Sequence, residues 1–267
     1  MKKLLLLAAL LAAVSVQAQD WAKAKLEKSP RHYEWVKVKR GNREVQSFIT
    51  YPEVKDKATA VIVIHEIFGL TDWARGVTDE LADAGYIAIA PDLLSGMGPG
   101  GGGTAEIGAS GVGKAIQSLP ADQITADLNA VVDYVSKLPA CNGKVVVMGF
   151  CWGGGQTFRF ATNNKEIKAA LSFYGPIPND SAAFAHIACP VYGFYAENDA
   201  RITTSVPKAA DAMKEAGKAY EPVTYPGAGH GFMREGETPE SNDRNHDANI
   251  KAREESWKRL KQILGKI

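Results

Sequence analysis

The sequence is poor in cysteine and nearly neutral, and both properties exclude classes of protein. It has only 3 cysteines among 267 residues, too few for a fold that depends on several disulfide bridges. Its 31 lysines and arginines are balanced by 30 aspartates and glutamates, which leaves a net charge of +1. No block of basic residues interrupts this balance, so we expect no binding of nucleic acid.

Long apolar stretches are also missing, apart from one near the N-terminus. Residues 4–14 are uninterruptedly apolar, which is shorter than the about 20 residues that a membrane-spanning helix needs. Two lysines precede this run, and Ser15-Val16-Gln17-Ala18 follows it with small residues at the spacing of a cleavage site. A buried N-terminal helix is disfavoured because the run has no polar face. We predict a signal peptide at 1–18, a periplasmic or secreted mature protein, and no membrane association after cleavage.

Residues 19–267 show strands alternating with helices and contain no internal repeat or linker. The turn Arg40-Gly41-Asn42-Arg43 lies between two apolar stretches and predicts a hairpin over Tyr33–Tyr51. Strands are predicted at 60–64, 87–90, 145–148, 169–173, 191–195 and 220–225, and helical patterns at 71–84, 124–138, 206–216 and 257–264. The pattern indicates one α/β domain: a mostly parallel sheet with helices on both faces, begun by an antiparallel hairpin.

A glycine-rich insertion at 95–113 interrupts this alternation. Nine glycines fall within residues 96–113, and glycine loses the most backbone entropy when it is ordered. One interpretation is a mobile surface insertion. The other is a lid, because the segment leaves the sheet after Pro91-Asp92, at the edge where open α/β sheets bind ligands.

The most informative motif is Gly149-Phe150-Cys151-Trp152-Gly153, between a predicted strand and a helix-compatible stretch. This is the nucleophile elbow of α/β-hydrolases with cysteine in place of serine. The central residue is strained, so its neighbours two positions away must lack a Cβ, and the following helix N-terminus favours a thiolate. We therefore predict that Cys151 is a nucleophile and not a small core cysteine in a glycine-rich turn.

A thiol nucleophile needs a base and an acid that orients the base, and in this fold class they follow in the order acid, then histidine. Asp199 follows the predicted strand at 191–195, with Glu197 as the competing acid. His230 follows the strand at 220–225 and has glycine on each side, which favours it over a structural histidine. The sequence thus predicts a Cys151–His230–Asp199 triad.

His65 and Glu66 end the first buried strand. A zinc site is excluded there, because the helical His-Glu-x-x-His pattern has Gly69 where the second histidine should be. The turn is instead predicted to lie beside the elbow, where the backbone N–H groups of Ile67 and Trp152 would form an oxyanion hole. Glu66 would then influence the protonation of the thiol; the alternative is a plain glutamate at a strand end.

Together these motifs resemble the dienelactone hydrolase (carboxymethylenebutenolidase) family over nearly the whole mature chain. The resemblance rests on His65-Glu66-x-x-Gly69-Leu70, the elbow sequence, Asp199 after a strand, and His230-Gly231-Phe232. It implies an α/β-hydrolase fold with Cys151 as nucleophile, Asp199 as acid and His230 as base. It also implies that Glu66 helps to ionise the thiol when substrate arrives.

The resemblance further implies two arginines that bind a substrate carboxylate. One maps to Arg234, four residues after His230. The other should follow the strand that ends at Pro91-Asp92, but residues 93–119 contain no arginine. This departure from the family's pattern places the dienelactone substrate itself in question.

The sequence therefore predicts a monomeric hydrolase that cleaves a small ester or lactone, including anionic ones, through a thioacyl-enzyme intermediate. The reaction needs no metal and no organic cofactor. The alternative from another class is a binding protein that kept the fold without the chemistry. A serine-type esterase or peptidase is disfavoured by the cysteine at the elbow.

Cys141 and Cys189 form the only remaining cysteine pair. Each precedes a predicted strand at the edge opposite the site, and the strand at 169–173 is expected between them. Two strand spacings are about 9.6 Å, beyond the roughly 7 Å between Cα atoms that a disulfide allows. We expect two reduced thiols.

Overall fold

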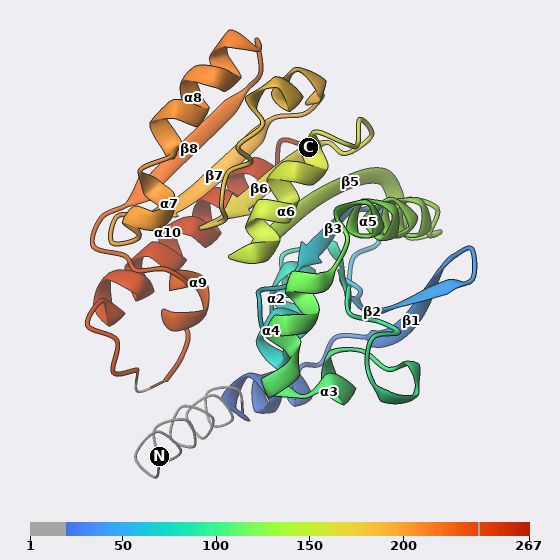
Figure 1. Ribbon diagram of the computed structural model, residues 1–267. Helices are drawn as coiled ribbons and strands as arrows, with labels where there is room; N and C mark the ends of the chain where they lie inside the picture. Colours follow the sequence, from blue (N-terminus) through green and yellow to red (C-terminus); the bar gives the residue numbers. More distant parts are fainter. Residues whose placement is uncertain (1–19, 240) are drawn as a thin grey trace, which may run out of the picture.

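The computed structural model describes residues 20–239 and 241–267. Within them lies an eight-stranded sheet with the strand order β1-β2-β4-β3-β5-β6-β7-β8 (Figure 1). The hairpin strands β1 and β2 and the pair β2–β4 are antiparallel, and all other neighbours are parallel. The strands are β1 (Tyr33–Arg40), β2 (Arg43–Thr50), β3 (Ala58–Ile64), β4 (Ile87–Pro91), β5 (Cys141–Phe150), β6 (Ala169–Phe173), β7 (Val191–Ala196) and β8 (Tyr220–Tyr225). The predicted mostly parallel sheet with an N-terminal hairpin is confirmed. The predicted signal peptide lies outside the described residues.

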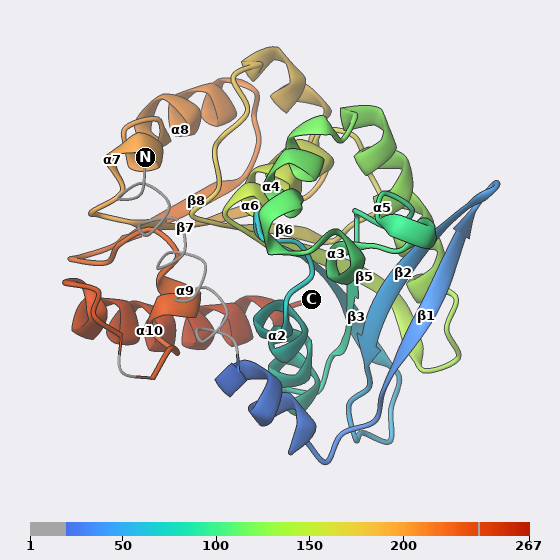
Figure 2. The ribbon, with the colours of Figure 1, turned by 60° about the horizontal axis from the view of Figure 1, so that its bottom comes forward.

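Helices cover both faces of the sheet, as predicted, and Figure 2 shows the three layers. The central strands alternate their side chains between two cores: Ile62 belongs to one and Val63 to the other. The first core is closed by α4 (Ala109–Ser118), α5 (Ala121–Ser136), α6 (Trp152–Ala161) and α8 (Val206–Glu215). The second is closed by the helix at 20–27, α2 (Asp72–Asp83) and α10 (His246–Leu264). No helix in the described part of the chain is both long and apolar enough to cross a membrane.

The glycine-rich insertion contains regular structure that composition did not predict. After the short turn η1 (Pro99–Gly101), it forms α3 (Thr104–Ile107) and then α4, which buries Val112 and Ile116 in the first core. Thr104 anchors the insertion, because its hydroxyl donates to Asp92 at 2.8 Å and accepts from the Leu70 N–H at 3.0 Å. The insertion is therefore tied to the carboxyl ends of both β4 and β3.

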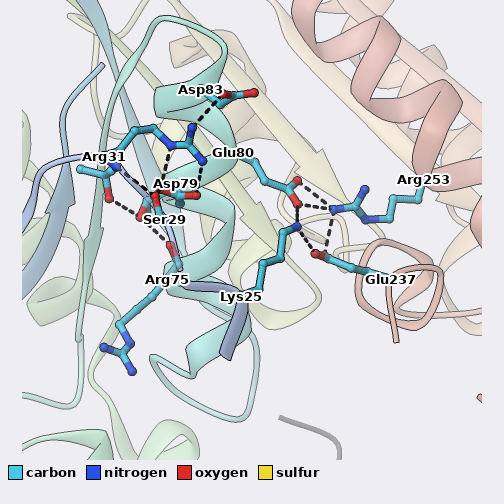
Figure 3. Close-up of polar contacts among 11 residues, drawn as sticks. Lys25, Ser29, Arg31, Arg75, Asp79, Glu80, Asp83, Glu237 and Arg253 are labelled. Carbon is cyan, nitrogen blue, oxygen red and sulfur yellow. Dashed lines mark hydrogen bonds and ion pairs between the residues drawn. The ribbon is translucent and has the colours of Figure 1, made fainter. Parts of the chain in front are cut away.

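A network of four charged side chains joins segments that are distant in the sequence (Figure 3). Lys25 pairs with Glu80 and lies 2.5 Å from Glu237, while Arg253 contacts the same two carboxylates at 2.7 and 2.8 Å. The Arg253 Nε also donates to the carbonyl of Met233 at 3.1 Å. The helix at 20–27, α2 and α10 are thus tied to the chain that follows β8.

The two cysteines outside the elbow are separated as predicted. Cys141 begins β5, Cys189 lies just before β7, and β6 is between these strands. Both thiols are free and buried.

Candidate active site

Cys151 occupies a sharp turn between β5 and α6, which is the predicted strand–elbow–helix geometry. Its backbone has φ 54° and ψ −118°, a positive φ that side chains rarely adopt. A Cβ on Gly149 would lie 2.3 Å from the Gly153 carbonyl oxygen, and one on Gly153 would lie 2.4 Å from that of His65. The glycines are therefore required by close backbone approach, and the thiol is presented partly exposed at the start of α6.

The structure brings the three predicted triad residues into one chain of contacts. The Nε2 of His230 lies 3.2 Å from the Cys151 Sγ, and its Nδ1 lies 2.5 Å from an Asp199 carboxylate oxygen. Asp199 follows β7 and His230 follows β8, so both stand at the carboxyl edge of the sheet. The competing acid Glu197 points elsewhere and accepts from the N–H of Gly227 at 2.8 Å.

The loop around His230 is held from two sides. Gly231 has φ 79°, so the glycine after His230 is needed for the left-handed backbone there. The N–H of Gly229 donates to the side chain of Asn249 in α10 at 2.8 Å, in the buried interior. The backbone conformation at Gly231 and the hydrogen bond at Gly229 together orient the imidazole of His230.

Burial lowers the pKa of His230, but hydrogen bonds and charges from Asp199 and Cys151 raise it more, from 6.5 to about 9. At neutral pH the imidazole is therefore cationic in this environment. An imidazolium 3.2 Å from the Sγ stabilises the thiolate, which is the nucleophilic form of cysteine.

Glu66 and Arg234 form a buried ion pair beside this triad. The Arg234 Nε lies 2.9 Å from the Glu66 carboxylate, and the two side chains are 20% and 4% exposed. Arg234 belongs to α9 (Phe232–Glu235), also contacts Glu235 at 2.6 Å, and lies 5.2 Å from the centre of the Phe68 ring. Burial raises the pKa of Glu66, although the charge of Arg234 opposes the rise. The sequence predicted both residues at the site but not that they pair.

The predicted oxyanion donors come from two segments that the fold brings together. Ile67 lies in the turn after β3, and Trp152 is the first residue of α6. The close approach of Gly153 to the carbonyl of His65 packs the start of α6 against the end of β3. Among the hydrogen bonds within residues 20–239 and 241–267, none uses the N–H of Ile67 or Trp152. The oxyanion hole itself stays a prediction.

Sequence reasoning missed Tyr174, which directly follows β6 and has φ 39°. Its ring is fully buried and meets His230 and Phe232 edge-on, with centroid separations of 5.2 and 5.1 Å. Its hydroxyl is buried without a hydrogen-bond partner in the described part of the chain, and burial raises its pKa. The available signal was its position after the strand next to the elbow strand.

Arg201 was missed as well. Its guanidinium lies 3.8 Å from the second oxygen of Asp199 and 3.4 Å from the Nδ1 of His230, and the side chain is 68% exposed. No cluster of three or more potential metal-binding side chains occurs in the described residues.

Comparison with known proteins identifies the family. The model of the dienelactone hydrolase family matches residues 45–267. A Salmonella typhi protein named "Putative carboxymethylenebutenolidase" is 32% identical over 201 residues, covering 71% of this chain and 73% of that protein. A protein of the same name from Saccharolobus solfataricus is 30% identical over 261 residues, covering 84% of this chain and 95% of the other.

Structural comparison gives the same fold. The crystal structure titled "Putative Dienelactone Hydrolase" from Klebsiella pneumoniae superposes with a TM-score of 0.76 at 24% identity, covering 89% of this chain and 99% of that one. The predicted α/β-hydrolase fold is thereby confirmed. The chain belongs to the dienelactone hydrolase family and is a hydrolase.

Proposed function

We propose that this hydrolase cleaves small esters or lactones through Cys151, and the observation that carries the proposal is the contact chain Cys151–His230–Asp199. The thiolate attacks the substrate carbonyl, and the N–H groups of Ile67 and Trp152 bind the oxygen as it becomes negative. His230 then donates its proton to the leaving alcohol oxygen, which yields a thioester on Cys151. Neutral His230 then takes a proton from water, which attacks the thioester; collapse of the intermediate releases the acid and restores the thiolate of Cys151 beside the imidazolium of His230.

The Glu66–Arg234 pair supports a preference for substrates that carry a carboxylate. Such a group would compete with Glu66 for the guanidinium of Arg234, which already pairs with Glu66 and Glu235. Glu66 would then be a buried carboxylate without its cation, and burial favours its protonated form. Uptake of a proton by Glu66 would remove its negative charge from the site, and this change favours the anionic form of Cys151.

The test is a panel of small esters and lactones, each offered with and without a free carboxylate. Wild type should turn over members of the panel, and Cys151→Ala should not. The matched control is Cys189→Ala, which removes a buried free thiol remote from the elbow and should leave the rate unchanged. Intact-protein mass spectrometry under rapid quench should show an acyl adduct on wild type and none on Cys151→Ala. Full activity in Cys151→Ala would exclude the thiol mechanism.

The panel also tests the alternative of a binding protein without chemistry. In that case the wild type would bind panel members but release no product from any of them. Arg234→Ala adds the substrate test: KM should rise for carboxylate-bearing esters far more than for their neutral counterparts. An equal rise in both would leave Arg234 without a substrate role.

We further propose that the protein is exported, on the strength of its first 18 residues. N-terminal sequencing of protein recovered from the periplasm or medium should begin at Gln19. Recovery of an uncleaved chain from the cytoplasm would exclude export.

A further inference from the structure

We propose that His65 is a positioning residue that holds both halves of the oxyanion hole, an inference that rests on the proposed function. The imidazole is fully buried at the carboxyl end of β3, directly before the turn that carries Ile67. It is a titratable group that the mechanism above does not use, although it lies between the two segments that supply the oxyanion donors.

The first contact is with the peptide bond between Glu66 and Ile67. The Nδ1 of His65 lies 2.9 Å from the carbonyl oxygen of Glu66, and the Nε2 lies 3.4 Å from the backbone N of Leu93. The Leu93 N–H can only donate, so the Nε2 carries no proton and the Nδ1–H must donate to Glu66. This network assigns a single tautomer to His65.

That carbonyl belongs to the same peptide unit as the proposed donor. The Glu66 C=O and the Ile67 N–H lie in one plane and point in opposite directions. A hydrogen bond that holds the carbonyl therefore also sets the direction of the N–H. Since the carbonyl accepts from both the Gly69 N–H at 3.1 Å and the His65 ring, the peptide is held from two sides.

The second contact is with Trp152, whose N–H is the other donor. The rings of His65 and Trp152 stack with their centroids 5.5 Å apart and their planes at 17°. The backbone of His65 also meets α6, where a Cβ on Gly153 would be 2.4 Å from the His65 carbonyl oxygen. One residue thus touches the supports of both donors. Burial lowers the pKa of His65, which keeps the ring neutral and in the assigned tautomer.

Two substitutions separate this role from simple packing. In His65→Asn the amide nitrogen overlays the Nδ1 position and keeps the donor to Glu66, whereas in His65→Gln the amide lies nearer the Nε2 position. We expect kcat for ester hydrolysis to fall about 10- to 100-fold in His65→Gln, somewhat less than complete loss of an oxyanion donor. In His65→Asn it should stay within about threefold of wild type, because the bond to the carbonyl is kept. KM should change little in both.

Alkylation of Cys151 by iodoacetamide is the control, because substitution at carbon creates no oxyanion. Its rate should be unchanged in both variants. Equal losses of kcat in the two variants, an undiminished kcat in His65→Gln, or a parallel loss of alkylation would each overturn the proposal.

A measurement on the wild type keeps the inference testable even if a variant does not fold. Nitrogen-15 NMR of histidine-labelled protein should show His65 with a protonated Nδ1 and an unprotonated Nε2 at neutral pH. The opposite tautomer would overturn the proposal. Failure of the proposed function is distinguishable, because it would appear as ester turnover that survives Cys151→Ala.

Discussion

Arg234→Ala should make the stability of the fold depend on pH more strongly than it does in the wild type. The variant leaves Glu66, with a side chain 4% exposed, without the cation that lies 2.9 Å away. Breaking a buried ion pair by removing one partner costs about 3–5 kcal/mol while the remaining group stays charged. Protonation of Glu66 removes the buried charge, so the variant should lose less of its free energy of unfolding at acidic pH.

The sign follows from the pKa of Glu66 in the two states. The unfolded chain releases the proton near the ordinary value of 4.5, whereas burial raises the pKa in the folded protein. Without Arg234, which lowers that pKa, the rise becomes larger. Between the two values the folded state binds more protons, so raising the pH favours unfolding by at most about 1.4 kcal/mol per pH unit. The variant should therefore approach wild-type stability near pH 4.5 and lose it progressively as the pH rises through the folded pKa.

Urea-unfolding curves at a series of pH values from about 5 to 8 would measure this dependence. The double variant Arg234→Ala, Glu66→Gln should recover most of the lost stability, because no charge is then buried alone. Arg201→Ala is the matched control, since that guanidinium is 68% exposed and 3.8 Å from a carboxylate that His230 also binds, so its removal should cost about 1 kcal/mol or less. A loss in Arg234→Ala that is the same at every pH, or that Glu66→Gln does not rescue, would refute the reasoning.

Further predictions follow from other parts of the site. Cys151→Ala should reduce hydrolysis of an activated ester to less than about a tenth of the wild-type rate with the fold intact, and Cys151→Ser should fold but react slowly. The raised pKa of His230 contributes stability that is fully present below pH 6.5 and is lost as the pH rises through about 9. Asp199→Asn should lower that pKa and weaken the pH dependence of stability. Equal stability–pH profiles in the variant and the wild type would contradict this. Tyr174→Phe should not reduce the thermal stability, because the buried hydroxyl has no partner to lose; a loss above about 1 kcal/mol would reveal a hydrogen bond. Thiol titration of unfolded, unreduced protein should find three free thiols, and a single free thiol would indicate a Cys141–Cys189 bridge.

The parts of the fold that sequence predicted are those in which local pattern and tertiary environment agree. Continuous apolar runs became the central strands because both faces of a parallel sheet are covered by helices. The elbow was recognisable for a similar reason. A Cβ at Gly149 or Gly153 would collide with the backbone, so the geometry requires glycine at both positions and the sequence shows it. Gly231 at φ 79° is a further example.

The helix α4 shows why local pattern can fail. Glycine disfavours a helix by about 1 kcal/mol per residue relative to alanine, so the segment gives a weak helical signal. The helix nevertheless forms and buries Val112 and Ile116, and burial of such side chains stabilises by more than the glycines cost. This outcome depends on a core that other segments supply.

Contacts between residues far apart in the sequence could not be predicted either, because they depend on how other segments pack. Glu66 and Arg234 were each predicted at the site, but they are separated by 168 positions and their pairing depends on how α9 packs. Tyr174 carries no motif of its own, and its contact with His230 exists only because β6 and β8 lie on the same side of β5. A residue type can be matched to chemistry from sequence, whereas its partner must be found in space.

The site combines two kinds of group. One part is held in place by backbone geometry and packing, and the other consists of side chains whose pKa values are shifted. The elbow is held by close backbone contacts, the Glu66–Ile67 peptide by hydrogen bonds from Gly69 and His65, and the His65 and Trp152 rings by stacking. His230 and Glu66 both have raised pKa values, but for opposite reasons: His230 because its cation is stabilised by partners, Glu66 because its anion is poorly solvated. Since the charge of Arg234 opposes the rise in the pKa of Glu66, an anion that took the place of Glu66 on Arg234 would let that pKa rise further. Under the proposed function, binding of an anionic substrate at Arg234 and ionisation of Cys151 would therefore be coupled through the charge of Glu66.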